Sequence, residues 1–188
     1  MPMPADLGNR RALVITTNYG VEQDELVKPV EHLRGLGAQV DIAATEKDSI
    51  VTLVGDRDPG QTVPATHSLS EVRADDYDLL LIPGGTINAD TLRLEDTALD
   101  AVRSFASSGR PVAAICHGPW VAVEADVLRG KTLTSYPSTA TDVRNAGGTW
   151  VDKEVQVCGA NGWTLITSRK PDDLPAFLDA INGALTPS

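Results

Sequence analysis

Cys116 is the side chain in this sequence whose type and position best suit nucleophilic chemistry. It follows an apolar run at residues 111–115 and precedes His117 and Gly118, where a predicted buried strand meets a predicted helix. A sharp turn at such a junction exposes a side chain, the start of a helix favours a thiolate with a lowered pKa, and nearby backbone N–H groups bind an oxyanion. We therefore predict a reactive thiol. The alternative is an inert cysteine that packs as a small hydrophobe.

Two ionisable groups are candidates to assist this thiol. Adjacent side chains in a tight turn point apart, so the sequence leaves open whether His117 serves the thiol, moves protons on a substrate, or caps a helix at the surface. Glu22 follows the first predicted strand, where a desolvated carboxyl with a raised pKa would donate a hydrogen bond to a thiolate. Spacing alone gives Glu22 no advantage over Asp24 and Glu25, which are alternatively ordinary charges in the first turn of a helix.

Backbone groups and one aromatic ring complete the candidate site. Gly84 and Gly85 end another predicted strand, where they either present N–H groups to a bound oxyanion or form a tight turn. Trp120 lies one turn after Cys116 and is a candidate pocket wall. The sequence has no phosphate-loop motif, no HExxH and no ligand cluster of His, Cys and carboxylates, so we expect neither a metal nor a cofactor.

Composition and charge indicate which partners the protein can bind and in which cellular compartment we expect it. The chain has 188 residues, 41% of them hydrophobic, which predicts one globular domain over residues 1–188 with residues 1–10 as a loose N-terminal tail. A net charge of −10 opposes binding to nucleic acid and to anionic membranes. The two cysteines, Cys116 and Cys158, are no disulfide framework, and no signal peptide precedes the domain, so we expect a cytoplasmic protein.

Strand and helix patterns alternate along the whole chain. Apolar runs predict buried strands at 12–16, 38–44, 78–82 and 111–115, and helical spacing predicts helices at 24–36, 97–107, 119–128, 138–145 and 171–181. A short strand at 50–54, a turn at 56–60 and a hairpin over 155–167 are also predicted. This order indicates a mainly parallel sheet covered by helices on both sides, whose ligands bind at the carboxyl ends of strands.

Several segments together resemble one known family. The strongest are LIPGG at residues 81–85 and PVAAICHGP at residues 111–119, and weaker matches occur at 128–131, 134–137, 145–147 and 150–152. The chain resembles the PfpI family, within the superfamily of the Parkinson-disease protein and the class I glutamine amidotransferases, over roughly residues 11–183. The resemblance implies a flavodoxin-like three-layer sandwich.

The resemblance also implies roles for individual residues. It implies that Cys116 is a nucleophile on a strained turn, that Glu22 is the acid hydrogen-bonded to its thiol, and that His117 and the amides of residues 84–85 shape the site. In proteins of this type a carboxylate of a neighbouring subunit approaches the histidine. The matching residue here is Asp90. The family implies a homodimer or a higher homo-oligomer.

Fold does not fix function in this superfamily, so three functions stay open. The family implies a cysteine-dependent stress-response hydrolase, of the deglycase or cofactor-independent glyoxalase type, that acts on small reactive carbonyls or their adducts. The first alternative is an intracellular cysteine peptidase or amidase whose triad of Cys116, His117 and Asp90 is completed in an oligomer. The second is a redox-sensing stress protein with little turnover.

Overall fold

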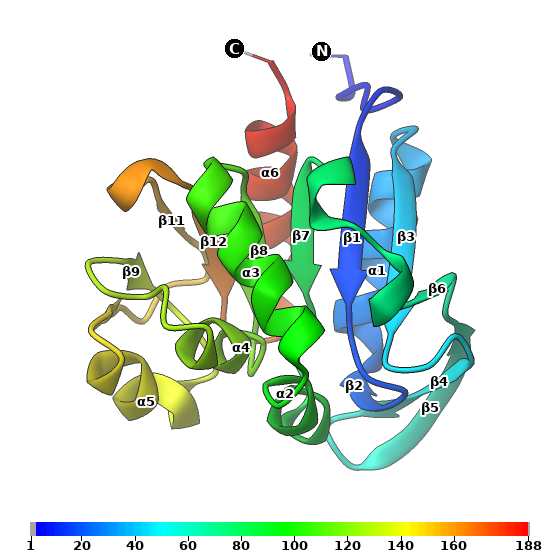
Figure 1. Cartoon of the computed structure of the whole chain (residues 1–188), viewed down its shortest axis with the longest axis horizontal. Helices are drawn as coiled ribbons and strands as arrows, with labels where there is room; N and C mark the ends of the chain where they lie inside the picture. The colour runs from blue at the N-terminus through cyan, green and yellow to red at the C-terminus, as the bar shows by residue number, and fades with distance from the viewer. Residues whose placement is uncertain (1–2, 188) are drawn as a thin grey trace.

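The centre of the computed structural model, which describes residues 3–187, is a seven-stranded sheet. Its strand order is β11-β12-β8-β7-β1-β3-β6 (Figure 1). All neighbouring strands are parallel except β11, which pairs antiparallel with β12. The strands are β1 (Arg11–Ile15), β3 (Gln39–Ala44), β6 (His67–Ser68), β7 (Leu79–Ile82), β8 (Val112–Ile115), β11 (Gln156–Cys158) and β12 (Leu165–Ser168). The predicted mainly parallel sheet and the hairpin at its edge are confirmed.

Helices cover both faces of this sheet and create two apolar cores. Side chains alternate along a strand, so Leu13 of β1 packs in the core beneath α3 (Asp96–Ser108) and α4 (Pro119–Glu124), with Phe105. Val14 packs in the other core, with Leu33 and Phe177 of α1 (Gln23–Gly35) and α6 (Leu174–Leu185). Figure 1 shows α3 in front of the strands and α1 and α6 behind them. This arrangement confirms the flavodoxin-like three-layer sandwich.

Smaller elements gather at the carboxyl edge of the sheet. A second, three-stranded sheet there contains β2 (Tyr19–Glu22), β4 (Ser49–Val54) and β5 (Asp58–Pro64), and two short helices, α2 (Thr86–Leu92) and α5 (Ala140–Asn145), lie at the same edge (Figure 1). A third sheet pairs β9 (Thr132–Leu133) with β10 (Thr149–Trp150) and lies beside β11, where Thr132 N donates to Cys158 Sγ at 3.3 Å. The short strand predicted at 50–54 is present as β4. Strands β2 and β5 and helix α2 were not predicted.

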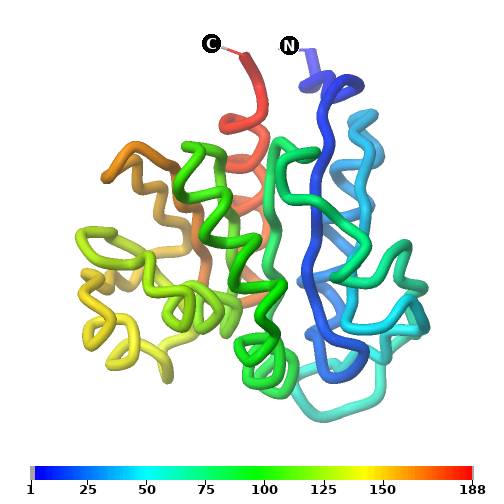
Figure 2. Tube along the Cα trace, viewed as in Figure 1, coloured from blue at the N-terminus to red at the C-terminus, as the bar shows by residue number. Residues whose placement is uncertain are grey.

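The N-terminal stretch differs from the predicted loose tail. Leu7 is fully buried in the core between α1 and the sheet, and its backbone N–H donates to the carbonyl of Leu36 at 2.8 Å. The prediction of a loose tail is therefore wrong from Leu7 onward, and Met1 and Pro2 lie outside the described residues. Both termini lie at the end of the sheet from which β1 starts, away from its carboxyl edge (Figure 2). No helix within residues 3–187 has the length and apolar character needed to cross a bilayer.

Candidate active site

Cys116 occupies a sharp turn between β8 and α4. Its φ of +63° lies in the left-handed region, which is unfavourable for a side chain other than glycine by about 1–2 kcal/mol. Two backbone hydrogen bonds keep it there, from Cys116 N to Ser168 O at 3.0 Å and from Tyr136 N to Cys116 O at 2.8 Å. The turn also needs Gly118, where a Cβ atom would lie 2.5 Å from the carbonyl oxygen of Ile82. The predicted strand-to-helix elbow is present.

Glu25 is the acid that lies against the Cys116 thiol. It lies in the first turn of α1, is fully buried and lines the same small cavity as Cys116. Its Oε1 accepts a hydrogen bond from Gly84 N at 2.9 Å, while Oε2 has no hydrogen bond of standard geometry to any residue between 3 and 187. Burial, and then the charge of Glu22, raise the pKa of Glu25 well above its ordinary value. Burial therefore favours the protonated form of Glu25, whose O–H can donate to the sulfur.

Glu22 has a different task, and the prediction that it hydrogen-bonds the thiol is wrong. Its Oε1 accepts from Gly55 N at 2.7 Å and its Oε2 from Asp56 N at 2.9 Å, so it fixes the turn between β4 and β5. The reason lies in where α1 begins. Glu22 ends β2, and Glu25 is the residue that the first helical turn carries toward the sheet.

His117 lies in direct contact with the thiol, although it is adjacent to Cys116 in a tight turn. Its Nδ1 lies 3.3 Å from Cys116 Sγ, and the residue is almost fully buried. The imidazole stacks on Tyr136, with ring centroids 4.8 Å apart, and meets the edge of Trp120 at 5.1 Å. Trp120 thus supports the histidine, and it is not among the residues that line the cavity beside the sulfur. On the outer edge of the ring, Nε2 lies 3.3 Å from Thr86 Oγ1.

The thiol is neutral at rest. Burial raises the pKa of Cys116 far above its ordinary value. An ionised Glu25 would raise this pKa further, but the protonated form adds no charge. The N–H groups of Gly85 and His117 lower the pKa, but burial outweighs them. The predicted lowering of the pKa is therefore wrong, and Cys116 needs a base to take its proton. Nδ1 of His117 is in position to do so, although burial lowers the pKa of His117 too.

The two glycines serve the site differently. Gly84 donates its N–H to Glu25, so the prediction that this amide is free for an oxyanion is wrong in the resting site. The N–H of Gly85 acts on the Cys116 thiol by lowering its pKa. Gly85 has φ +88°, and a Cβ there would lie 2.8 Å from Glu22 N, so glycine is required. Gly85 therefore keeps its predicted position at the reacting atom, and Gly84 orients the acid.

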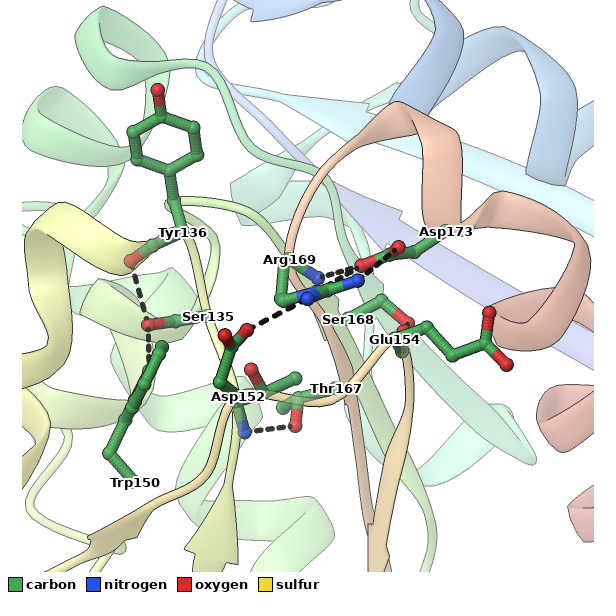
Figure 3. Close-up of polar contacts among 10 residues, drawn as sticks. Ser135, Tyr136, Trp150, Asp152, Glu154, Thr167, Ser168, Arg169 and Asp173 are labelled. Atoms are coloured by element: carbon green, nitrogen blue, oxygen red, sulfur yellow. Dashed lines mark hydrogen bonds and ion pairs between the residues drawn. The ribbon is translucent and has the colours of Figure 1, made fainter.

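A small cavity opens beside the sulfur. Its volume is about 210 Å³, and its lining residues come from five parts of the chain: Glu22, Glu25, Gly55, Asp56, Cys116, Tyr136 and Pro171. One wall is braced by Arg169, whose Nη1 lies 2.7 Å from Asp152 Oδ1 and whose Nε lies 2.9 Å from Asp173 Oδ2 (Figure 3). These ion pairs tie the segment that carries Pro171 to its surroundings. The cavity suits a small molecule or the tip of a modified side chain.

The other singled-out residues lie apart from this cavity. Asp90 is exposed on α2, and none of the contacts described between residues 3 and 187 joins it to His117. Its approach to the histidine of another subunit stays a prediction. Cys158 is a buried free thiol at the end of β11 and accepts a hydrogen bond from Thr132 N. Within the described part of the chain, no three His, Cys, Asp or Glu side chains group as metal ligands.

Known proteins share this chain's sequence and fold. General stress protein 18 of Bacillus subtilis (strain 168) is 37% identical over 171 residues, which cover 91% of this chain and 94% of that protein. Protein/nucleic acid deglycase 2 of Escherichia coli (strain K12) is 38% identical over 171 residues, with the same coverage of 91% and 94%. The crystal structure of Drosophila melanogaster DJ-1beta matches with a TM-score of 0.82 at 31% identity, over 94% of this chain and 90% of that chain.

These matches extend over nearly the whole chain, including every element that positions the site. Residues 10–183 match the model of the DJ-1/PfpI family. The segments that carry the resemblance in the sequence, at residues 81–85 and 111–119, form the two strand ends that meet at the sulfur. The resemblance is confirmed, and the chain belongs to the DJ-1/PfpI family.

Proposed function

We propose that this protein is a cysteine-dependent hydrolase that acts on small reactive carbonyls, or on their adducts with amines and thiols. The observation that carries the proposal is the contact of 3.3 Å between Cys116 Sγ and His117 Nδ1, with the buried acid Glu25 against the same sulfur. Similarity to a protein named as a protein/nucleic acid deglycase, and to a general stress protein, supports this chemistry.

The reaction follows from the three groups around the sulfur. His117 Nδ1 takes the thiol proton while Sγ bonds to the aldehyde carbon, and the oxygen that becomes negative is protonated, which gives a hemithioacetal. With an amine adduct, the amine leaves as this bond forms. Movement of one hydrogen between the two neighbouring carbons then converts the hemithioacetal to a hydroxyacyl thioester. Water hydrolyses the thioester and frees Cys116, so methylglyoxal and one water give lactate with no oxidant.

Glu25 and His117 take separate parts in this sequence. Glu25 is protonated beside the sulfur, so its O–H stabilises the negative charge that develops when the thiol proton leaves. It adds no charge of its own there. His117 is the base, because burial lowers its pKa and keeps the imidazole neutral at pH 7. A protonated carboxyl group, which donates, and a neutral imidazole, which accepts a proton, therefore act on the same sulfur.

A substrate panel tests the proposal. The parent, Cys116→Ala and Cys116→Ser proteins are assayed with methylglyoxal, with a methylglyoxal-modified peptide and with casein, and lactate and free amine are measured. We expect carbonyl turnover in the parent and at least a hundredfold loss in both Cys116 variants. Cys158→Ala is the matched control, because it removes the other buried thiol and should keep turnover. Carbonyl turnover by Cys116→Ala at the parental rate would refute the proposal.

The casein arm separates this function from a peptidase. The cavity of about 210 Å³ favours a small carbonyl or a modified side-chain tip over an extended polypeptide. Casein cleavage without carbonyl turnover would favour the peptidase instead. A homodimer or larger assembly and a cytoplasmic location stay predictions. Light scattering coupled to gel filtration would measure the first, and fractionation of cells the second.

A further inference from the structure

A carboxylate of the same chain reaches His117 through one hydroxyl group. Asp56 lies in the turn between β4 and β5, with φ +60°, and its N–H is held by Glu22 at 2.9 Å. Its Oδ1 accepts from Thr86 N at 2.9 Å, and its Oδ2 accepts from Thr86 Oγ1 at 2.6 Å. Thr86 Oγ1 in turn lies 3.3 Å from His117 Nε2. The four residues form a continuous polar path from the turn to the ring.

The direction of each hydrogen bond on this path can be worked out from the donors present. A carboxylate only accepts, so the single hydrogen of the Thr86 hydroxyl points to Asp56. Toward His117 the same oxygen can then only accept, which requires a hydrogen on Nε2. Ser138 Oγ, 3.4 Å from Nε2, can accept the same hydrogen. A neutral imidazole carries one ring hydrogen, so Nδ1 is bare where it faces the thiol at 3.3 Å.

We infer that Asp56 and Thr86 are positioning residues that fix His117 in the tautomer whose bare Nδ1 accepts the Cys116 proton. The inference rests on the proposed function, and it completes a cysteine–histidine–carboxylate set within one chain. When the Sγ–H bond breaks and Sγ bonds to the substrate carbon, the proton moves to Nδ1. The imidazolium then keeps its Nε2–H on Thr86, with the charge of Asp56 behind it.

The residues around the imidazole of His117 hold it in one orientation. Tyr136 stacks on one side of the imidazole and the edge of Trp120 meets it at 5.1 Å, so the ring keeps its orientation. Asp56 is the charged group that acts on His117, and it raises the pKa that burial lowers. Asp56 is itself placed by Glu22, because the carboxylate of Glu22 accepts hydrogen bonds from the consecutive backbone N–H groups of Gly55 and Asp56. Glu22, the second buried glutamate of the site, therefore positions the carboxylate that faces His117 through Thr86.

Three variants test the path, and each is chosen to keep the backbone. Asp56→Asn removes the charge, and asparagine tolerates the left-handed conformation. Thr86→Val removes only the hydroxyl, and Thr86→Ser restores it. Asp58→Asn is the matched control, because Asp58 is an exposed carboxylate in the same hairpin whose described partner is Arg57. Thermal melting of each variant establishes that it is folded before the other measurements.

The direct measurement is the tautomer. The chain has three histidines, so long-range ¹H–¹⁵N correlation spectra are simple, and loss of signals in His117→Gln assigns the site. We expect the hydrogen on Nε2 in the parent, Thr86→Ser and Asp58→Asn proteins, and a mixed or Nδ1–H form in Asp56→Asn and Thr86→Val. We expect kcat for methylglyoxal, and the rate of Cys116 alkylation by iodoacetamide, to fall about tenfold to a hundredfold in the latter two.

Several results would overturn the inference. They are an Nδ1–H tautomer in the parent, a loss of turnover without a change of tautomer, or a changed tautomer with parental alkylation and turnover. Loss of turnover in Asp90→Asn but not in Asp56→Asn would assign the histidine to a carboxylate of another copy. If the parent converts no carbonyl substrate, the proposed function fails, whereas the tautomer and the alkylation rates still decide the inference about Asp56 and Thr86.

Discussion

The buried carboxyl group of Glu25 makes the stability of this protein depend on pH in a defined direction. In the folded state Glu25 is enclosed and accepts one hydrogen bond, from Gly84 N at 2.9 Å. Burial, followed by the charge of Glu22, raises its pKa well above the ordinary value. In the unfolded chain the group is exposed and its pKa returns to about 4.3. At pH values between these two pKa values, the folded protein therefore holds a proton on Glu25 that the unfolded chain releases.

The sign and size of the effect follow from this difference. The contribution of the protonated group is fully present below the unfolded pKa, and it is lost as pH rises toward and through the raised folded pKa. Each pKa unit between the two states lowers the free energy of unfolding by about 1.4 kcal/mol. Glu25→Gln cannot ionise, yet its carbonyl can accept from Gly84 N and its amide can donate to the sulfur. The parent should therefore lose stability relative to this variant as pH rises from 4.5, by about 1.4 kcal/mol for each pKa unit by which folding raises the pKa of Glu25.

Urea denaturation at pH 4.5, 6, 7 and 8 measures this difference. The matched control is Asp24→Asn in the same helical turn, because Asp24 is exposed and pairs with Lys28. We expect the parent and Asp24→Asn to keep a nearly constant difference, since an exposed i,i+4 pair contributes only about 0.5 kcal/mol. A constant difference between the parent and Glu25→Gln would refute the assignment of a protonated Glu25. A parent that gains stability over the variant with rising pH would show an ionised carboxylate.

Three further changes have defined outcomes. Burial lowers the pKa of His117 below its ordinary 6.5. As pH falls, kcat/KM should therefore decrease only below pH 6.5. A pH–rate profile whose acid limb is centred above pH 6.5 would contradict this. Gly118→Ala places a Cβ 2.5 Å from Ile82 O and should cost about 1–3 kcal/mol of stability in urea denaturation, with an unchanged midpoint as the contrary result. Lys131→Met leaves three carbonyls, two of them in buried hydrogen bonds, without their ammonium donor and should cost about 2–3 kcal/mol, measured in the same way. A variant as stable as the parent would contradict that role.

The elements that could be predicted from the sequence are those with a strong apolar pattern. Strands β1, β7 and β8 are buried on both faces, so they read as nearly continuous apolar runs, and β3 is marked by its apolar Val40 and Ile42. Strand β5 is exposed along most of its length and contains Pro59, Gly60 and Pro64, so it carries neither an apolar run nor an alternating pattern. Helix α2 has seven residues and no clear stripe. Tertiary contacts at the edge of the site, rather than local preference, define these two elements.

The residues of the candidate site differ in the same way, because only some of them carry a local sequence signal. Cys116, His117 and Gly85 are recognisable because each lies in or beside a local signal, a strand that ends in a turn. Glu25 and Asp56 are placed in the site by contacts with Gly84 and Thr86, which are 59 and 30 positions away along the chain. One signal for Glu25 was available. It shares the buried face of α1 with Leu26, Pro29 and Leu33, where an unpaired carboxyl is unusual, whereas Glu22 precedes that helix.

The surroundings of the sulfur show how a thiol with a raised pKa can still be a nucleophile. The O–H of Glu25 and the N–H groups of Gly85 and His117 are donors at the sulfur, and the bare Nδ1 of His117 is an acceptor. At rest these donors face a neutral thiol, to which they contribute little. They become strong partners when the proton moves to Nδ1 and the sulfur gains charge, so the site favours the state in which the bond to the substrate forms.

The nearby carboxylates fit this arrangement because their charges are balanced away from the sulfur. Glu22 accepts two backbone N–H groups, and Asp56 accepts the N–H and the hydroxyl of Thr86. Glu25 lacks a second donor, so it keeps its proton and adds no charge beside the thiol. The number of donors around each of the three acids, rather than its distance from Cys116 along the chain, therefore decides which one serves the sulfur.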